Sequence, residues 1–125
     1  MEVTRLSDAL GAKISGVDLS NVDAGTAEEI RESFHKHQVL LFRNQDISME
    51  QHISFSKNFG PLEVHISKDS LHEDHEEILL VSNMKKDGEY VGVENAGDAW
   101  HSDLSYMPEP SLGSLLYALE VSEIG

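Results

Sequence analysis

Apolar residues recur at helical spacing in two segments of the first half of the chain. In the first segment, three apolar residues lie three and four positions apart, which predicts a helix through about residue 37. Those residues are Ala27, Ile30 and Phe34. The helix start is predicted within residues 23–29, where Thr26 and Glu29 have the spacing of a capping box, in which each side chain satisfies a backbone N–H near the other.

The second helical segment begins at another capping-box pair, Ser48 and Gln51. Its end is predicted at Gly60-Pro61, because Gly terminates helices and Pro cannot continue them. One broad face carries the larger side chains, namely Met49, His52, Ile53, Phe55 and Phe59. We interpret His52 as a packed side chain of this face, and His35 and His37 as last-turn residues that favour the negative end of the first helix.

Short apolar runs elsewhere predict strands. We expect one or two strands within residues 3–19, with Ile14, Val17 and Leu19 buried, and a strand covered on both faces at 39–42. Further strands are expected at Leu62–Ile66, Ile78–Val81 and Leu112–Val121, with a hairpin turn at Asp87-Gly88 followed by a return strand through Tyr90, Val91 and Val93. This order favours an α+β, mainly β fold of the jelly-roll type, with the helices outside. A jelly roll has about eight strands, and this chain supplies fewer, so we expect an incomplete fold.

Composition narrows the range of functions. The chain has 125 residues, one domain's worth or a piece of a larger one, and a formal charge of −14. That charge argues against a nucleic-acid-binding surface and against anionic membranes, because both require clustered Lys and Arg. The absence of cysteine excludes disulfides, thiolate nucleophiles and zinc–thiolate sites. Because no secretory signal or membrane-spanning run is visible, we expect a soluble, cytoplasmic protein.

The clearest chemical signal is the His-x-Asp pair formed by His101 and Asp103. In an extended strand, residues two apart point to the same face, so an imidazole nitrogen and a carboxylate oxygen would project together. They would supply two of the three ligands of the 2-His-1-carboxylate facial triad found in non-haem Fe(II) oxygenases.

A second histidine pair, His72 and His75, lies in the acidic segment 68–77 beside the carboxylates of Glu73, Asp74, Glu76 and Glu77. These residues are of the types that bind divalent ions. We favour the simpler interpretation of a solvated loop.

Several segments in the same order resemble the taurine dioxygenase-like (TauD/TfdA) family of Fe(II)- and 2-oxoglutarate-dependent dioxygenases. They are His37–Gln45, Phe59–Leu62, Trp100–Tyr106 and Pro110–Gly125. The resemblance covers nearly the whole chain and implies a double-stranded β-helix (jelly-roll) fold with flanking helices. It makes residues 1–125 the N-terminal portion of a single dioxygenase domain whose remainder is absent.

The resemblance assigns roles to individual residues. It makes His101 and Asp103 the catalytic iron ligands, and it matches His65 to a substrate-contacting histidine. Asn83, at a strand exit, is a second candidate for substrate binding or else a turn residue. In the family, a Gly-Asp-Thr segment, the second iron-binding histidine and an arginine that binds 2-oxoglutarate follow further along. We expect all three beyond Gly125, so no cofactor-binding residue for 2-oxoglutarate is assigned here.

The implied reaction couples oxidative decarboxylation of 2-oxoglutarate, giving succinate and CO2, to hydroxylation of a small organic substrate by dioxygen. We expect the complete enzyme to be a homo-oligomer, and this chain by itself to be inactive. The alternative is a degenerate, non-catalytic β-helix module that binds a partner. A zinc or nickel hydrolase is a weaker third hypothesis, because no hydrolytic base accompanies the pair.

Overall fold

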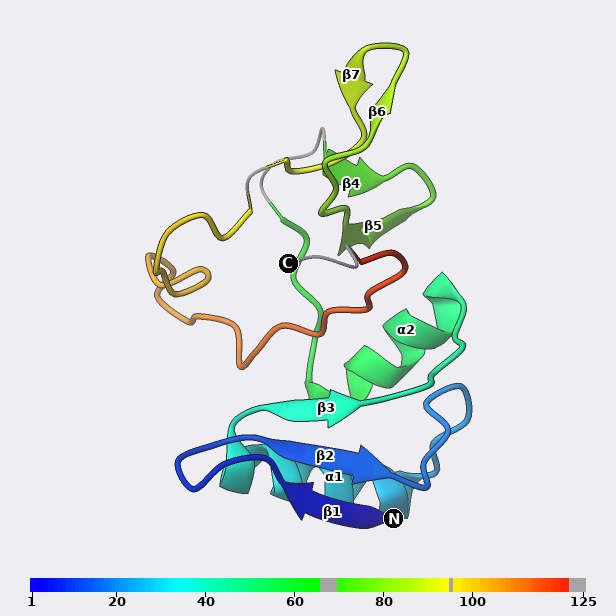
Figure 1. Ribbon diagram of the computed structural model, residues 1–125, viewed down its shortest axis with the longest axis vertical. Helices are drawn as coiled ribbons and strands as arrows, with labels where there is room; N and C mark the ends of the chain where they lie inside the picture. Colours follow the sequence, from blue (N-terminus) through cyan, green and yellow to red (C-terminus); the bar gives the residue numbers. More distant parts are fainter. Residues whose placement is uncertain (66–69, 95, 122–125) are drawn as a thin grey trace. The chain divides into compact units, whose positions relative to one another are not determined.

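The computed structural model describes residues 1–65, 70–94 and 96–121, and it divides the chain into two compact units (Figure 1). Unit 1 comprises Met1–Gly60 and unit 2 comprises Pro61–Gly125. The buried hydrophobic residues found in the described part of the chain all belong to unit 1: Ala12, Ile14, Leu19, Ala27, Ile30, Ile47, Ile53 and Phe55.

Unit 1 is built on a three-stranded sheet of β1 (Glu2–Arg5), β2 (Ala12–Ser15) and β3 (Leu40–Phe42), in that order. β1 pairs antiparallel with β2, and β2 pairs parallel with β3. A parallel pair requires a long crossover, which the first helix, α1 (Ala24–His37), provides. The strands expected within residues 3–19 are confirmed, whereas β3 is only half-buried and not covered on both faces as predicted.

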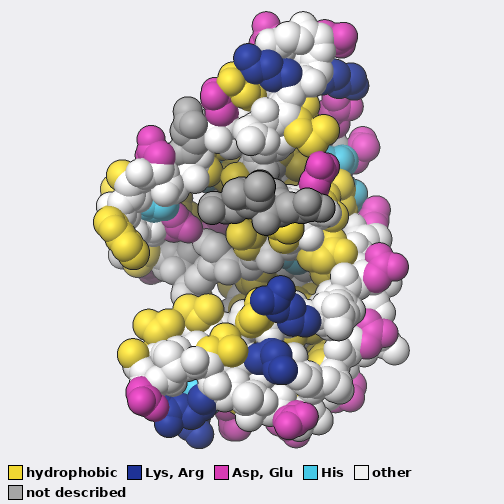
Figure 2. All heavy atoms as spheres, viewed as in Figure 1, with side chains coloured by type: hydrophobic (Ala, Val, Ile, Leu, Met, Phe, Trp, Pro, Cys, Tyr) yellow, Lys and Arg dark blue, Asp and Glu magenta, His cyan; other side chains and the backbone are white. Residues whose placement is uncertain are grey.

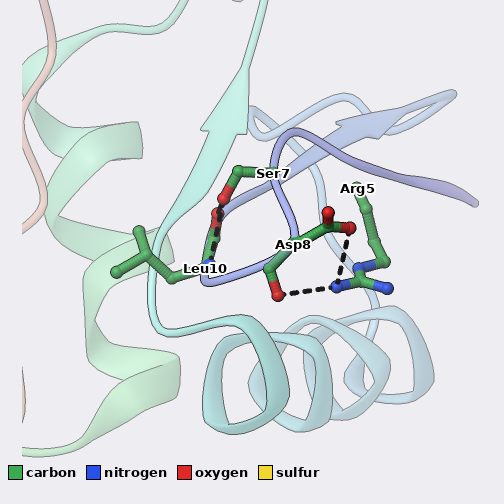
Figure 3. Close-up of polar contacts among 4 residues, drawn as sticks. All are labelled: Arg5, Ser7, Asp8 and Leu10. Carbon is green, nitrogen blue, oxygen red and sulfur yellow. Dashed lines mark hydrogen bonds and ion pairs between the residues drawn. The ribbon is translucent and has the colours of Figure 1, made fainter.

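The loop between β1 and β2 is closed by its own side chains (Figure 3). The guanidinium of Arg5 donates to the carbonyl oxygen of Asp8 at 2.9 Å and lies 3.9 Å from its carboxylate. The hydroxyl of Ser7 donates to the carbonyl oxygen of Leu10 at 2.6 Å and accepts from the Leu10 N–H at 3.1 Å. These short-range contacts satisfy backbone groups that the strand ladder leaves unpaired.

α1 begins one turn earlier than its predicted capping box. Asp23 is the N-cap, and its carboxylate accepts from the N–H of Thr26 at 2.9 Å. The prediction that Thr26 caps the helix with Glu29 was therefore wrong, because an Asp three residues upstream satisfies the same kind of orphan donor. The predicted end near His37 is confirmed.

The second helix, α2 (Met49–Ser56), has the predicted capping box of Ser48 and Gln51. It continues into a 3-10 turn, η1 (Lys57–Phe59), which ends at Gly60 as expected. All four phenylalanines of the chain are joined by edge-to-face ring contacts. Ring centroids lie 6.0 Å apart for Phe34 and Phe59, 5.6 Å for Phe59 and Phe55, and 6.0 Å for Phe55 and Phe42. This series links α1, η1, α2 and β3.

Unit 2 contains two small hairpins. β4 (Leu71–His72) pairs antiparallel with β5 (His75–Leu79) around a two-residue turn. The segment predicted as a loop, 68–77, is therefore partly a hairpin, and the predicted strand Ile78–Val81 begins earlier and ends at Leu79. Residues 68 and 69 lie outside the described residues.

The second hairpin joins β6 (Lys85–Lys86) to β7 (Glu89–Tyr90) at the predicted Asp87-Gly88 turn. Both turn residues have positive φ, 54° and 89°, as a two-residue hairpin turn of type I′ requires. The ammonium of Lys85 lies 4.2 Å from the ring centroid of Tyr90 on the opposing strand. Lys85 and Lys86 make one end of this hairpin basic, and Figure 2 shows further Lys and Arg side chains over unit 1, with acidic side chains spread over the visible surface.

Two predicted strands are not strands in this structure. Residues 62–65 of the predicted Leu62–Ile66 strand are irregular, and Ile66 lies outside the described residues. The predicted strand Leu112–Val121 is likewise irregular, although Leu115 and Tyr117 are half-buried and Leu116 is exposed. The alternating pattern persists there without a ladder of hydrogen bonds. A β-strand is defined by backbone hydrogen bonds to a second segment, and the apolar pattern of one segment does not determine whether such a segment is present.

The observed architecture is α+β, as expected, with one three-stranded and two two-stranded sheets among the described residues. These sheets form no closed barrel, so the jelly roll expected from the sequence is not seen in the part of the chain that the structure describes. No helix within the described ranges has the length and apolar character needed to cross a lipid bilayer.

Candidate functional site

The His-x-Asp pair lies in an irregular segment of unit 2, not in the strand predicted for it. The backbone turns at Asp103, and Leu104 adopts a positive φ of 49°. The N–H of Met107 closes this turn by donating to the carbonyl oxygen of Leu104 at 2.9 Å. A leucine in the left-handed region is uncommon and costs about 1–2 kcal/mol, so local strain accompanies the turn at the candidate ligand.

The two side chains nevertheless converge. Nε2 of His101 lies 3.1 Å from Oδ1 of Asp103. The other ring nitrogen, Nδ1, lies 2.7 Å from the carbonyl oxygen of Ala99. Because a carbonyl oxygen can only accept, Nδ1 is the nitrogen that carries the proton in the neutral ring.

This tautomer determines how the two facing atoms, Nε2 of His101 and Oδ1 of Asp103, interact. With the proton on Nδ1, Nε2 presents a lone pair to Oδ1, and an ionised carboxylate also only accepts. Two acceptors at 3.1 Å repel each other unless a proton or a cation lies between them. Two donor atoms that each bind a divalent ion at about 2.1 Å, at a right angle, would lie about 3.0 Å apart. The separation of Nε2 and Oδ1 therefore fits neighbouring positions on one metal ion.

The surroundings of His101 raise its pKa above the ordinary value of 6.5. The hydrogen bond to the Ala99 carbonyl contributes most, and the negative charge of Asp103, its hydrogen bond to the ring and the negative charge of Asp98 act in the same direction, while desolvation opposes them. The same negative potential that attracts a proton to the ring attracts a metal ion.

Asp103 has a second partner that the sequence did not indicate. The hydroxyl of Ser114 donates to Oδ2 of Asp103 at 2.9 Å. Ser114 lies eleven residues further along the chain, so no local motif connects the two residues. Only the return of the chain after the turn at Leu104 brings them together.

The pair is accessible to solvent. The side chain of His101 is 53% exposed and that of Asp103 is 59% exposed. The neighbouring Trp100 is fully exposed. Nothing in unit 2 that the structure describes buries the pair, so an ion or small molecule could reach both donor atoms.

The two predicted substrate-binding residues are less well defined. His65 is half-buried in the irregular segment after Gly60, and Asn83 is exposed in the short connection before β6. The structure places both in unit 2 with His101 and Asp103. Their roles stay predictions.

The other histidine pair is brought together by the β4–β5 hairpin. His72 and His75 face each other across the turn, with ring centroids 5.3 Å apart and planes inclined by 30°. Nδ1 of His72 accepts from the N–H of Asp74 at 3.2 Å. Among the described residues, no group of three or more His, Asp or Glu side chains could hold a metal ion, here or at His101.

The comparison with protein families identifies the chain. Residues 2–125 match the family described as taurine catabolism dioxygenase TauD, TfdA family. The chain belongs to this family. The family comprises Fe(II)- and 2-oxoglutarate-dependent dioxygenases, so the resemblance drawn from Trp100–Tyr106 and the other segments is confirmed.

Curated relatives agree with this assignment. The chain is 37% identical to pentalenolactone F synthase of Streptomyces avermitilis, over 100% of this chain and 42% of that protein. It is 28% identical to (S)-phenoxypropionate/alpha-ketoglutarate-dioxygenase of Sphingobium herbicidovorans, over 99% of this chain and 42% of that protein. The chain thus spans about two-fifths of the length of the curated relatives that it matches.

Solved structures give the same result for part of the chain. A taurine dioxygenase from Burkholderia xenovorans is similar with a TM-score of 0.56 and 32% identity, covering 59% of this chain and 27% of that one. AAD-2, solved in complex with Mn(II) and N-oxalylglycine, has a TM-score of 0.50 and 31% identity, covering 57% of this chain and 30% of that one.

Proposed function

We propose that this chain forms the first part of a dioxygenase that uses Fe(II) and 2-oxoglutarate to hydroxylate a small organic substrate, with release of succinate and CO2. The observation that carries the proposal is the 3.1 Å separation of Nε2 of His101 and Oδ1 of Asp103, which fits neighbouring positions on one metal ion. Membership of the family supports it.

Each residue of the pair has a distinct task in this proposal. His101 supplies a neutral nitrogen, and the hydrogen bond to the Ala99 carbonyl keeps the lone pair on Nε2, directed toward Asp103. Asp103 supplies the anionic oxygen. An imidazole and a carboxylate are two of the three donors of the facial triad, so the residues present fit Fe(II). When bound, Fe(II) would supply the chemistry with dioxygen that couples decarboxylation of 2-oxoglutarate to oxidation of a C–H bond.

The remaining groups are proposed to come from polypeptide outside residues 1–125. Among the described residues, no third His, Asp or Glu side chain joins His101 and Asp103 in a group that could hold a metal ion, which supports placing the third ligand, a histidine, and the arginine for 2-oxoglutarate elsewhere. The relatives have more than twice the length matched here, which leaves ample chain for both. His65 and Asn83 are proposed to contact the organic substrate.

The test uses the complete protein, loaded anaerobically with Fe(II). We expect it to release succinate from 2-oxoglutarate when dioxygen is admitted, and we expect His101→Ala to remove this activity. A complete protein that binds Fe(II) at these residues without consuming 2-oxoglutarate would favour the non-catalytic binding module. Equal succinate release by the wild type and by His101→Ala would show that the pair is not the iron site.

A further inference from the structure

The two oxygens of the Asp103 carboxylate have different environments. Oδ1 lies 3.1 Å from Nε2 of His101, and Oδ2 accepts from the hydroxyl of Ser114 at 2.9 Å. The hydroxyl must be the donor, because an ionised carboxylate has no proton to give. One oxygen is thus occupied by a protein donor, and the other is left facing the imidazole.

The different partners of Oδ1 and Oδ2 are important because an exposed aspartate side chain rotates readily. A rotation about the Cβ–Cγ bond would exchange the two oxygens or turn both away from His101, at little cost in water. A hydroxyl fixed to one oxygen selects the orientation in which the other points at Nε2. Hydrogen bonds of this kind orient the ligands of metal ions in proteins and strengthen the binding of the ion.

The chain between the two residues is arranged to bring the hydroxyl back to the carboxylate. Leu104 reverses the backbone directly after Asp103, and Met107 closes the turn. Pro108 and Pro110 then restrict the return toward Ser114, since each fixes its own φ. The contact between Ser114 and Asp103 is therefore the product of a defined loop of ten residues.

We propose that Ser114 is a positioning residue, which holds the Asp103 carboxylate through Oδ2 so that Oδ1 stays beside Nε2 of His101 for a divalent metal ion. This inference rests on the proposed function, because it assumes that the pair binds a metal. Ser114 itself does not touch the ion. It acts through Asp103.

A purely structural role for Ser114 predicts different behaviour. If the hydrogen bond only stabilised the loop, its loss would lower the thermal stability of the metal-free protein. Metal affinity would then fall only as far as stability falls. The contact is exposed, and exposed polar contacts contribute little to stability. Under the positioning role, metal affinity falls while the stability of the metal-free protein is unchanged.

The experiment measures Mn(II) binding to the complete protein by electron paramagnetic resonance of the free ion, together with the unfolding midpoint of the metal-free protein. Ser114→Ala should weaken Mn(II) binding by about 10- to 100-fold, the usual effect of removing a group that orients a metal ligand. Ser114→Thr keeps the hydroxyl and should retain most of the affinity. Ser111→Ala, on the same segment, is the matched control and should bind as the wild type does.

A double-mutant cycle separates the positioning role from the proposed function. In the Asp103→Ala background, Ser114→Ala should produce no further loss, because there is no carboxylate left to orient. If Asp103→Ala binds Mn(II) much more weakly than the wild type does, but Ser114→Ala binds normally, the positioning role is wrong and the metal site stands. A wild type that fails to bind Mn(II) would overturn the metal site and the positioning role together.

Discussion

Gly92 approaches Leu80 so closely that a Cβ atom on Gly92 would lie 2.8 Å from the carbonyl carbon of Leu80 and collide with its oxygen. The same carbonyl oxygen accepts from the N–H of Val93 at 2.9 Å. The chain on either side of the β6–β7 hairpin is therefore held together at a point where only glycine fits. This contact lies between β5 and the segment that leads to the His–Asp pair.

We expect Gly92→Ala to destabilise unit 2 by about 2–3 kcal/mol, since the added methyl group meets backbone and cannot be accommodated by a side-chain rotation. Denaturant unfolding of the protein would measure the change. Gly88→Ala is the comparison, because its φ is 89° but nothing lies within 4 Å of the added atom. It should cost about 1 kcal/mol from backbone strain alone. The explanation fails if Gly88→Ala proves the more costly of the two.

The cap of α2 gives a second prediction. The hydroxyl of Ser48 accepts from the N–H of Gln51, whose side chain accepts from the N–H of Ser48 at 2.7 Å. We expect Ser48→Ala to lower the free energy of unfolding by about 0.5–2 kcal/mol, because it leaves an N–H at the helix start without its partner. Ser54→Ala, at an exposed position of the same helix, is the control and should change stability little or raise it slightly. Equal losses for the two variants would contradict the capping role.

A third prediction concerns the pH dependence of α1. The backbone N–H and the hydroxyl of Thr26 hold the pKa of Asp23 below its ordinary value of 3.8. The folded pKa is thus lower than the unfolded one, so the carboxylate stabilises the helix above the unfolded pKa, and this contribution is lost as the pH falls through the lowered folded value. Asp23→Asn keeps an acceptor oxygen but has no charge to titrate.

We therefore expect the stability difference between the wild type and Asp23→Asn to be constant above about pH 5 and to shrink as the pH falls below about 4, where free aspartate becomes protonated. Urea unfolding of both proteins across this range would measure the difference. A difference that did not change with pH would show that Asp23 caps the helix without a contribution from its charge.

The fourth prediction tests the candidate metal ligand. Asp103→Ala in the complete protein should abolish hydroxylation and weaken binding of the metal ion, because the variant lacks the anionic donor of the pair. Asp98→Ala is the matched control, since it removes a nearby negative charge that acts on His101 but no proposed ligand. Turnover of 2-oxoglutarate and equilibrium dialysis of the metal would be compared for the two variants. Unchanged turnover by Asp103→Ala would exclude it as a ligand.

Local patterns predicted local structure well. The capping box of Ser48 and Gln51 and the Asp87-Gly88 turn depend on residues a few positions apart, and both are found as expected. The predicted start of α1 within residues 23–29 is confirmed, but its cap was assigned to Thr26, because Asp23 and Thr26 could each cap the helix and the sequence does not rank them. The predicted strand Leu112–Val121 failed for a different reason, since a strand is defined by pairing with another segment.

The candidate site also has features that the local sequence predicted and features that it did not. Its two residues were found from their spacing, although the strand that was expected to align them is absent from residues 100–106. Their approach depends instead on the turn at Asp103 and Leu104 and on the carbonyl of Ala99. Ser114 could not be found from a pattern, because its contact depends on the path of the whole intervening loop. The role of the pair as iron ligands stays a prediction.

The fully exposed Trp100 is the one tryptophan of the sequence, and it directly precedes His101. Within residues 1–125, ultraviolet fluorescence excited at the indole band therefore comes from a single position beside the His–Asp pair. An indole in water emits at long wavelength, and any partner that covered it would shift the emission toward the blue. Residues 1–125 thus carry their own optical probe, so that titrations of this polypeptide need no attached dye.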